Sequence, residues 1–404
     1  MAWVSFTLIV ATIALLGHLY LYRRLFRPVL PHGSARRAAG IALATLALSL
    51  LSRRPLRVLG SDIAQAQAIV AYTWLAVALW LLLATVLKDL TALVMAPFRG
   101  RKPVSKNHEP PTAQAARQVS GPDLSRRAML ARGVHHGLHV GALLGGSTAA
   151  AYGAFRAFAP AEISEVEVRL PRLSRSLDGM TLVHLSDIHV GPFIDAAFLD
   201  VLVERANAQR PDAVVITGDL VDGSVATLGP AVARLSRLRS RFGTYFVTGN
   251  HEYYSGHRAW CGFLEQLGIT VLRNRSVRLG DGGAALNLAG VDDWSAGRRF
   301  PGSGYDLQTA LAGRDPDRAT VLLAHQPVNF EVAVDRGVGL QLSGHTHGGQ
   351  VFPMTMLVQM RYPFCRGLYH HRDSHIYVSR GCGFWGPPSR IGSPPEIAAL
   401  HLTV

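Results

Sequence analysis

The stretch TLVHLSDIH, residues 181–189, shows the pattern that decides the fold: a short apolar run followed at once by aspartate and histidine. Four similar apolar runs follow it. The five runs cover residues 181–185, 213–217, 244–248, 320–324 and 338–342. Short apolar runs rich in β-branched residues predict strands that are covered on both faces. Helical stretches lie between them, for example 196–209 and 230–239, so we expect an α/β domain.

Each of these five runs ends in a polar motif. In chain order the motifs are Ser186-Asp187-Ile188-His189, Gly218-Asp219-Leu220-Val221-Asp222, Gly249-Asn250-His251-Glu252, Ala324-His325-Gln326-Pro327 and Ser343-Gly344-His345-Thr346-His347-Gly348-Gly349-Gln350. One such motif is a weak signal, because histidine and aspartate are common in loops. Five of them at the carboxyl ends of strands, where α/β folds bind their ligands, are specific. The set predicts a metal site at that edge.

The ordered set resembles the calcineurin-like metallophosphoesterases over residues 181–404. The closest likeness is to their bacterial membrane-associated branch, because Gly344-His-Thr-His-Gly-Gly-Gln and the later Gly386-Pro-Pro and Pro394-Pro-Glu-Ile stretches resemble that branch. The resemblance implies an α/β fold, a four-layer αββα sandwich of two mixed β-sheets. An all-α transmembrane region would precede it.

The resemblance also implies a site for two divalent metal ions. Asp187, His189, Asp219 and His347 would bind the first ion, and Asp219, Asn250, His325 and His345 would bind the second. Asp219 would bridge the two ions, and Asn250 and His251 would face the substrate phosphate. An iron–tyrosinate centre is not expected, because Asp222 occupies the position where such phosphatases need tyrosine.

These residue types suit the hydrolysis of a phosphate ester. Two ions about 3.5–4 Å apart can neutralise the phosphoryl group and turn a shared water into a hydroxide nucleophile near neutral pH. We expect His251 to protonate the leaving group, since its ordinary pKa of about 6.5 is close to working pH. A purely orienting role for His251 is the alternative. The nitrogen and oxygen ligands favour Mn, Fe or Zn.

Four apolar segments in the first 160 residues predict a membrane region. They are Trp3–Tyr22, Ala38–Ser52, Ile63–Leu87 and Gly133–Phe155. A bilayer-spanning helix needs about 20 residues, so Ala38–Ser52 is marginal and a re-entrant segment is its alternative. His135, His136 and His139 in the last segment are interpreted as neutral side chains, with metal or haem binding as the alternative. We therefore expect a transmembrane region at 1–98, a basic Pro-rich linker at 99–132, a fourth apolar helix at 133–157 and a phosphoesterase domain at 161–404.

The net charge of +14 arises mainly in the loops between the apolar segments. Loops rich in Arg and Lys stay in the cytoplasm, which places both termini and the catalytic domain on the extracytoplasmic side of a multi-pass protein. Ser125-Arg126-Arg127-Ala128-Met129-Leu130 resembles a twin-arginine export signal, so we expect a bacterial cell membrane. The three cysteines are too widely spaced for a CxxC metal site.

We therefore expect an enzyme, a metal-dependent phosphoesterase at the membrane surface. Residues 354–371 mix apolar side chains with Arg361 and Arg366. We expect this stretch to lie against the bilayer and to admit a phosphorylated or nucleotide-linked lipid, and a core-packed loop is the equal alternative. A nuclease or nucleotide phosphodiesterase would use the same metal core, but the basic residues cluster outside the catalytic domain, so no nucleic-acid partner is expected. A non-catalytic metal-binding membrane scaffold is the remaining alternative.

Overall fold

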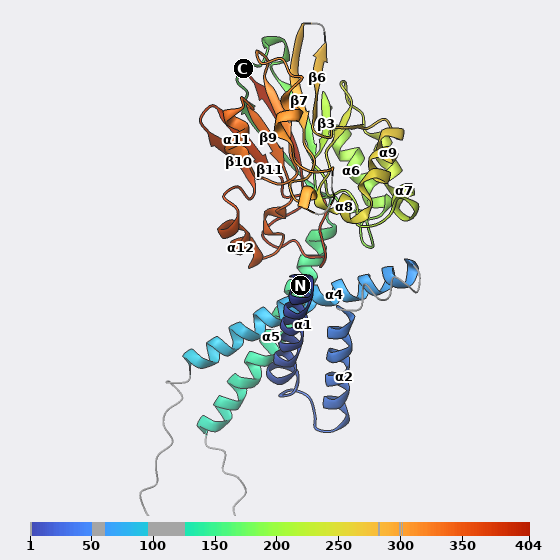
Figure 1. Ribbon diagram of the computed structural model, residues 1–404. Coiled ribbons are helices and arrows are strands. Elements are labelled where there is room, and N and C mark those ends of the chain that lie inside the picture. The colour runs from blue at the N-terminus through green and yellow to red at the C-terminus, as the bar shows by residue number, and fades with distance from the viewer. Residues whose placement is uncertain (1, 51–60, 96–125, 282, 299, 301) are drawn as a thin grey trace, which may run out of the picture. The chain divides into compact units, whose positions relative to one another are not determined.

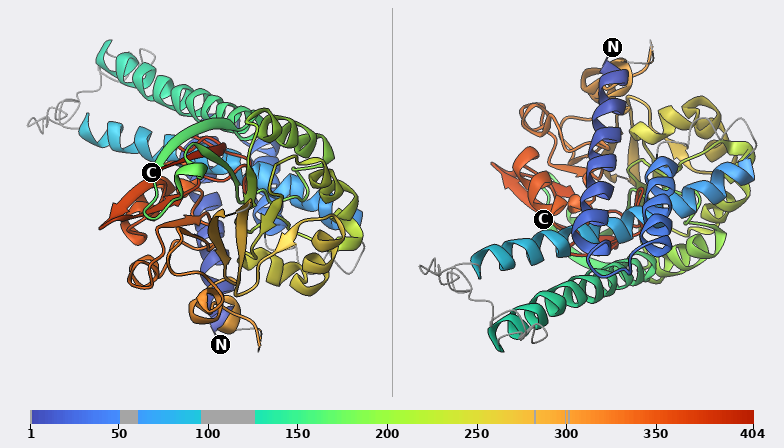
Figure 2. Two further views of the ribbon diagram at one scale, coloured as in Figure 1. Left: turned by 90° about the horizontal axis from the view of Figure 1, so that it is seen from above. Right: turned by 90° about the horizontal axis from the view of Figure 1, so that it is seen from below.

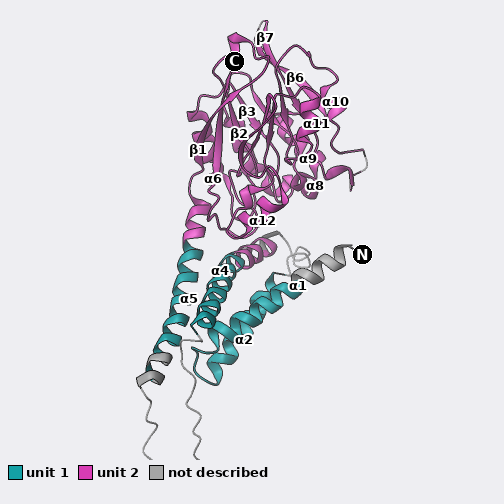
Figure 3. Ribbon diagram, turned by 90° about the vertical axis from the view of Figure 1, so that its left-hand side faces the viewer, with its two compact units in different colours: residues 1–58, 73–151 teal, residues 59–72, 152–404 magenta. Residues whose placement is uncertain are grey.

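The structure, a computed structural model, describes residues 2–50, 61–95, 126–281, 283–298, 300 and 302–404. It divides into two compact units (Figure 3): unit 1 holds residues 1–58 and 73–151, and unit 2 holds residues 59–72 and 152–404. Unit 2 begins before the expected residue 161 because the end of helix α5 (Arg126–Phe158) packs into it. Ala157 is fully buried in its core, and the Gly153 carbonyl accepts a hydrogen bond from the Arg390 amide.

All four predicted apolar segments are helical. They lie in α1 (Ala2–Leu21), followed by a π-helical turn η1 (Tyr22–Phe26), in α2 (Ser34–Ser49), in α4 (Ser61–Val94) and in α5. Among the described residues, one helix is long and apolar enough to cross a bilayer, Ile63–Val94, with a mean hydropathy of 2.2. Helix α2 has 16 residues. It is therefore about 24 Å long, shorter than a hydrocarbon core of about 30 Å.

Of the predicted linker, the structure describes only the C-terminal end, residues 126–132. Residues 99–125 lie outside the described residues. Helix α5 begins at Arg126, so residues 126–132, which the sequence assigned to the linker, are helical and include the Arg126-Arg127 pair. The apolar helix is thus longer than expected at its amino-terminal end.

Polar contacts connect the helices of unit 1. The Asp89 carboxylate lies 2.7 Å from the Nε atom of Arg24 and 2.8 Å from the Nζ atom of Lys88. The Nδ1 atom of His139 lies 2.9 Å from the carbonyl oxygen of His135, and its Nε2 atom lies 3.1 Å from that of Arg24. His139 therefore contributes to the packing of the helices of unit 1.

Unit 2 contains two six-stranded mixed sheets, as the resemblance implied. In spatial order the first sheet holds β1 (Glu162–Arg169), β12 (Glu396–Thr403), β2 (Met180–Leu185), β3 (Ala213–Ile216), β4 (Thr244–Phe246) and β5 (Thr270–Val271). The second holds β10 (Gly367–His371), β11 (Ser374–Val378), β9 (Leu340–Ser343), β8 (Thr320–Leu323), β7 (Ala284–Gly290) and β6 (Arg275–Asp281). The pairs β12–β2, β10–β11 and β6–β7 are antiparallel, and the other neighbours are parallel. All five predicted strands are present, with small shifts of their ends.

Alternating side chains separate the layers of this sandwich. Leu182 of β2 and Val321 of β8 pack between the sheets, because successive residues of a strand point to opposite faces. Val183 of β2 packs instead against helices of the first outer layer, which contains α6 (Ala196–Ala208), α7 (Val225–Val232) and α9 (His257–Gln266). Helices α10 (Leu307–Leu311) and α11 (Phe330–Asp335) cover the second sheet. The four-layer αββα order is confirmed (Figures 1 and 2).

One predicted helix is displaced. The sequence predicted a helix at 230–239 beginning at Pro230, but α7 spans Val225–Val232 and continues as a 3₁₀ turn, Ala233–Arg237. Ser224 has the extended backbone typical of the residue before a helix, so the helix begins there. Pro230 then lies inside α7, where it removes one helical hydrogen bond.

Candidate metal centre

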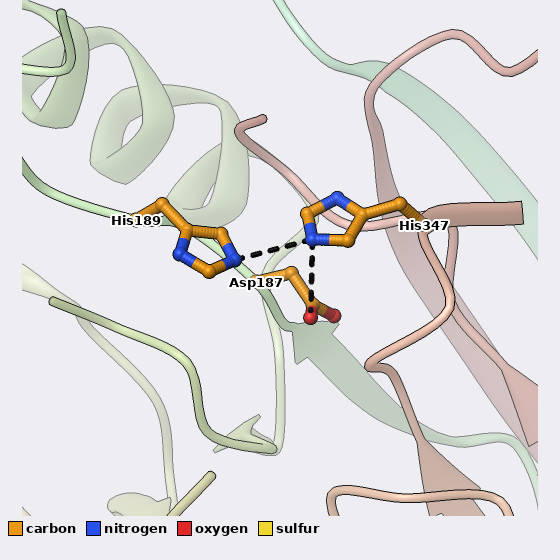
Figure 4. Close-up of side chains that lie close together, drawn as sticks. All are labelled: Asp187, His189 and His347. Atoms are coloured by element: carbon orange, nitrogen blue, oxygen red, sulfur yellow. Dashed lines mark hydrogen bonds and ion pairs between the residues drawn. The ribbon is translucent and has the colours of Figure 1, made fainter. Parts of the chain in front are cut away.

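The candidate ligands meet where the two sheets end. The first group contains Asp187 and His189 after β2 and His347 after β9, so both sheets contribute. The Nε2 atoms of His189 and His347 are 3.1 Å apart, and the Nε2 atom of His347 lies 3.5 Å from Asp187 Oδ1 (Figure 4). All three residues are buried. Their nitrogen and oxygen atoms converge on one point, as the sequence predicted.

The second group contains Asp219 after β3, His325 after β8 and His345 after β9. The His325 Nε2 atom lies 3.2 Å from Asp219 Oδ2 and 3.2 Å from the Nδ1 atom of His345. Asp219 Oδ2 also lies 3.8 Å from the Nε2 atom of His189 in the first group. The Asp219 carboxylate therefore lies between the two groups, in the place where a bridging ligand is needed.

Asn250 opens the short helix α8 (Asn250–Ser255) after β4. Its side-chain Oδ1 atom is buried and has no hydrogen-bond partner. A buried amide oxygen without a donor is costly, so it calls for a cation or an ordered donor. Together with the imidazole nitrogens and carboxylates nearby, this orphaned oxygen fits a pair of divalent ions such as Mn, Fe or Zn.

His251 is held beside both groups. Its backbone N–H donates to Asp219 Oδ1 at 2.9 Å, and its Nδ1 atom lies 2.5 Å from Asp222 Oδ1. Asp222 Oδ2 lies 3.3 Å from the Nδ1 atom of His189, so this carboxylate contacts two imidazoles. Burial lowers the pKa of His251, but Asp219 and the Asp222 hydrogen bond outweigh it and raise that pKa to about 9. The imidazole is thus protonated at neutral pH.

The backbone of the ligand loops is unusual. Five candidate ligands have left-handed φ values: Asp187 (50°), His189 (56°), Asp219 (50°), His345 (70°) and His347 (50°). Such angles are uncommon outside glycine, and they cluster at functional sites where the surrounding fold enforces them. They turn the chain sharply where each ligand follows its strand.

Two of the glycines in the motifs permit close approach of the backbone to a ligand. A Cβ atom on Gly249 would lie 2.2 Å from Asp219 Oδ1, and one on Gly344 would lie 2.1 Å from Asp187 Oδ2. Neither distance is physically possible without a shift of the carboxylate. Alanine at either position would therefore displace a ligand. These two glycines thus leave room for a carboxylate in addition to permitting a tight turn.

Glu252 fixes two ligand loops, a role that was not predicted from the sequence. It is fully buried on α8 and accepts backbone N–H bonds from Gly249, Asp219 and Leu220 at 2.6, 2.9 and 2.8 Å. One carboxylate thereby joins the loop after β3 to the loop after β4. The only signal in the sequence was its place in the Gly-Asn-His-Glu motif.

Thr217 lies beneath both groups and was also missed. Its carbonyl accepts a hydrogen bond from His325 Nδ1 at 2.7 Å, while its hydroxyl donates to Ser186 Oγ, which donates to Asp187 Oδ2. Because that hydroxyl proton is already used, His184 Nε2, 2.7 Å away, must be the donor to Thr217 Oγ1. Burial lowers the pKa of His184 to about 3, so it donates as a neutral ring.

Arg390 supports the first group from the C-terminal loop. Its guanidinium is buried, and its Nη2 atom lies 3.0 Å from the Nδ1 atom of His347. Its Nη1 atom donates to the carbonyl oxygens of Arg380 and His347 at 2.7 and 3.2 Å. Burial lowers the pKa of Arg390 to about 10, which leaves it charged at neutral pH.

Helix α12 (Met354–Arg361) borders the second group. Met356, Leu357 and Met360 expose 56%, 53% and 84% of their surface, so the alternative of a core-packed loop is wrong for this part of 354–371. The Tyr362 hydroxyl at the end of the helix lies 3.5 Å from the Nε2 atom of His345. An exposed apolar helix therefore adjoins the candidate ligands.

Comparison with known proteins agrees with this geometry. The family model described as calcineurin-like phosphoesterase matches residues 180–349. A Bos taurus protein named "Transmembrane protein with metallophosphoesterase domain" is 42% identical over 62% of this chain and 59% of its own length. An uncharacterized metallophosphoesterase of Aquifex aeolicus is 35% identical over 55% of this chain and 84% of its own length. The chain thus spans about three-fifths of the bovine relative.

Among solved structures, a dimetal phosphatase from Danio rerio aligns with 50% of this chain and 88% of its own chain, at 16% identity and a TM-score of 0.36. A 5'-nucleotidase precursor from Thermus thermophilus aligns with 56% of this chain and 54% of its own, at 17% identity and a TM-score of 0.36.

Proposed function

Because this chain belongs to the calcineurin-like phosphoesterase family, we propose that it is a metal-dependent phosphoesterase, a hydrolase with two divalent ions. The observation that carries the proposal is the sharing of one carboxylate by two ligand groups: Asp219 lies within 4 Å of both His325 and His189. Chance contacts between strand ends would not leave two groups of lone-pair donors around a common carboxylate. A carboxylate in that place can bridge two ions about 3.5–4 Å apart.

The proposed ligand sets are those that the resemblance implied. Asp187, His189, Asp219 and His347 would hold the first ion, and Asp219, Asn250, His325 and His345 the second. When bound, two divalent ions neutralise the phosphoryl group and provide a nucleophile from water at neutral pH. The donor set favours Mn, Fe or Zn, with Mn as our first choice for reconstitution.

His251 supplies the proton chemistry in this proposal. Its backbone is fixed by Asp219 and its ring by Asp222, which leaves Nε2 directed toward the space between the two groups, 3.9 Å from Asp219 Oδ2. The protonated imidazole binds a phosphoryl oxygen and then donates its proton to the leaving oxygen. Asn250 would orient the same phosphate from the neighbouring position.

The direct test is metal reconstitution of the purified full chain in detergent. After removal of metal by a chelator, Mn, Fe or Zn is added back, and phosphate monoesters, diesters, pyrophosphates and DNA are offered as substrates. We expect ester hydrolysis that needs metal, no cleavage of DNA, and no activity in Asp219→Asn. If no ester is hydrolysed by a folded protein that contains two ions, the chain is a metal-binding scaffold instead.

We extend the proposal to a phosphorylated or nucleotide-linked lipid as substrate. Exposed Met356, Leu357 and Met360 on α12 adjoin the second ligand group, and Arg361 ends the helix near Arg366, where both suit anionic headgroups. A helix long and apolar enough to cross a bilayer and relatives named as transmembrane proteins support this location. If lipid phosphates in vesicles react no faster than soluble nitrophenyl esters, and Arg361→Glu with Arg366→Glu changes neither rate, the lipid substrate is excluded.

Orientation in the membrane is part of the same proposal. The Arg-rich loops favour a multi-pass protein of a bacterial cell membrane with an extracytoplasmic catalytic domain. The three native cysteines are buried, so single cysteines placed at exposed positions can be labelled selectively from outside intact cells. Labelling of a cysteine at Val332 only after lysis would contradict this orientation. Retained export after Arg126→Lys with Arg127→Lys would argue against a twin-arginine signal.

A further inference from the structure

Two exposed aromatic side chains flank His251. The Tyr254 ring centroid lies 5.4 Å from that of His251, and the Trp385 centroid lies 5.7 Å from it on another segment of the chain. Both rings stand nearly perpendicular to the imidazole, at 65° and 75°. Tyr254 exposes 56% and Trp385 49% of its surface, whereas the His251 side chain exposes 14%. The accessible edge of His251 therefore lies beside two rings that face solvent.

The ligand loops themselves position these rings. Gln350, which follows the loop of His347, accepts a hydrogen bond from the Trp385 amide at 2.9 Å and donates to its carbonyl at 3.0 Å. Tyr254 follows His251 by three residues on α8, so the two side chains share one face of that helix. The segment that carries each aromatic ring is thus tied to a segment that carries a residue of the candidate metal centre.

The position of the rings suggests what they recognise. In the proposed reaction His251 touches the phosphoryl group, so the organic part of the ester leaves the site past Tyr254 or Trp385. Exposed aromatic rings bind planar groups by stacking, and every nucleobase has a planar face that can stack.

We propose that Trp385 and Tyr254 form a stacking subsite for a planar aromatic group, a nucleobase, attached to the phosphate that His251 contacts. This inference rests on the proposed phosphoesterase function and narrows its substrate class to nucleoside esters. A competing explanation is that exposed Trp and Tyr lie in the headgroup region of a bilayer. The contacts with His251 favour the subsite, because a membrane anchor needs no register with the metal centre.

The test compares two ligands that differ only in the base. They are the 5′-methylenephosphonates of adenosine and of methyl riboside, in which carbon replaces the ester oxygen, so neither can be hydrolysed. Binding to the full chain, loaded with Mn in detergent, is measured by calorimetry. Base stacking predicts that the wild type binds the adenosine compound roughly tenfold more tightly, and that Trp385→Ala removes most of this preference. Trp385→Phe should keep most of it.

A matched control is Trp294→Ala. Trp294 exposes 37% of its surface but packs on Tyr305, at a centroid distance of 5.2 Å, and makes no ring contact with His251. The control should keep the full preference for the adenosine compound. Equal preference in wild type and Trp385→Ala would overturn the subsite and leave the bilayer explanation. If the preference is found but the Mn-loaded wild type hydrolyses no ester, the subsite stands and the proposed function fails.

Discussion

The two halves of the candidate metal centre, its first and second ligand groups, use similar residues but surround them differently. In the first half His347 faces a cation: burial lowers the pKa of His347, and the charge of Arg390 lowers it further. In the second half His325 faces an anion: burial lowers its pKa, but the Asp219 carboxylate outweighs burial and raises it. His347 and His325 therefore bind a proton with different affinity. The two halves should respond differently to mutation and to pH.

The largest effect should come from the residue that the halves share. Asp219→Asn removes the carboxylate between His189 and His325 and should lower kcat by roughly 10⁴-fold or more, as when a member of a cooperative catalytic unit is lost. Metal analysis should show that both halves bind less metal. Asp200→Asn, at a half-buried position of α6 that pairs with Arg237, is the control and should keep normal activity. Undiminished hydrolysis in Asp219→Asn would contradict a bridging role.

A change at Arg390 should break the first half selectively. Arg390→Gln leaves the carbonyl oxygens of Arg380 and Gly383 without their buried donor, which should lower the free energy of unfolding by about 3 kcal/mol. His347 loses its support as well, so we expect about one metal ion per chain instead of two and roughly 100-fold weaker activity. Denaturant unfolding and elemental analysis measure these effects.

The control for Arg390 comes from the same loop. Arg380→Gln removes an arginine whose Nη2 atom pairs with Glu396 at 2.6 Å and not with a ligand. It should keep two ions per chain. If both variants lose metal equally, general loosening of the loop explains the effect and Arg390 has no specific role at the first half.

Acid should weaken the second half first. A metal ion must displace the proton of His325, whose pKa is raised, whereas His347 is already deprotonated. Below the pKa of a competing group, apparent affinity falls by about tenfold for each pH unit. Lowering the pH from about 8 to about 6 should thus release one ion before the other, as calorimetric titration can measure. Simultaneous release at every pH would contradict this difference.

The smallest effect should come from Thr217, whose hydroxyl supports the first half while its carbonyl supports the second. Thr217→Val keeps the shape but removes the hydroxyl between His184 and Ser186, which should cost about 1–2 kcal/mol of stability. The backbone carbonyl that accepts from His325 Nδ1 remains, so metal affinity should fall by roughly tenfold at the first half and little at the second. Thr227→Val, at an exposed hydroxyl on α7, is the matched control. Equal losses at both halves would show that the hydroxyl does not act through Ser186 and Asp187 alone.

The sequence predicted the strands and the ligands because both are local. A run such as 181–185 reveals its strand by composition, and Asp187 follows it directly. Arg390 and Thr217 were missed because nothing near them in the chain marks their role. Arg390 lies 43 residues after His347 and meets it only once the C-terminal loop has returned to the site. Thr217 resembles any threonine at a strand end in the sequence, and its role depends on the contact of its carbonyl with His325, which only the fold brings about.

The ends of helices were also predicted poorly from the sequence. Pro230 favours the start of a helix, yet α7 begins at Val225, because the loop after Asp222 ends there. The exposure of Met360 on α12 could not be predicted from the sequence either, because apolar composition alone does not distinguish a buried helix from one with an exposed face.

Each ligand group draws on both sheets, and this has a thermodynamic consequence. A cation held by β2 on one side and β9 on the other ties the two layers together across their common rim. An ion that binds only the native state adds its binding free energy to that of folding, about 4 kcal/mol at a thousandfold excess over its dissociation constant. The availability of metal would then determine the stability of the folded domain as well as its catalytic rate. Loss of metal would expose the chain to proteolysis at that rim.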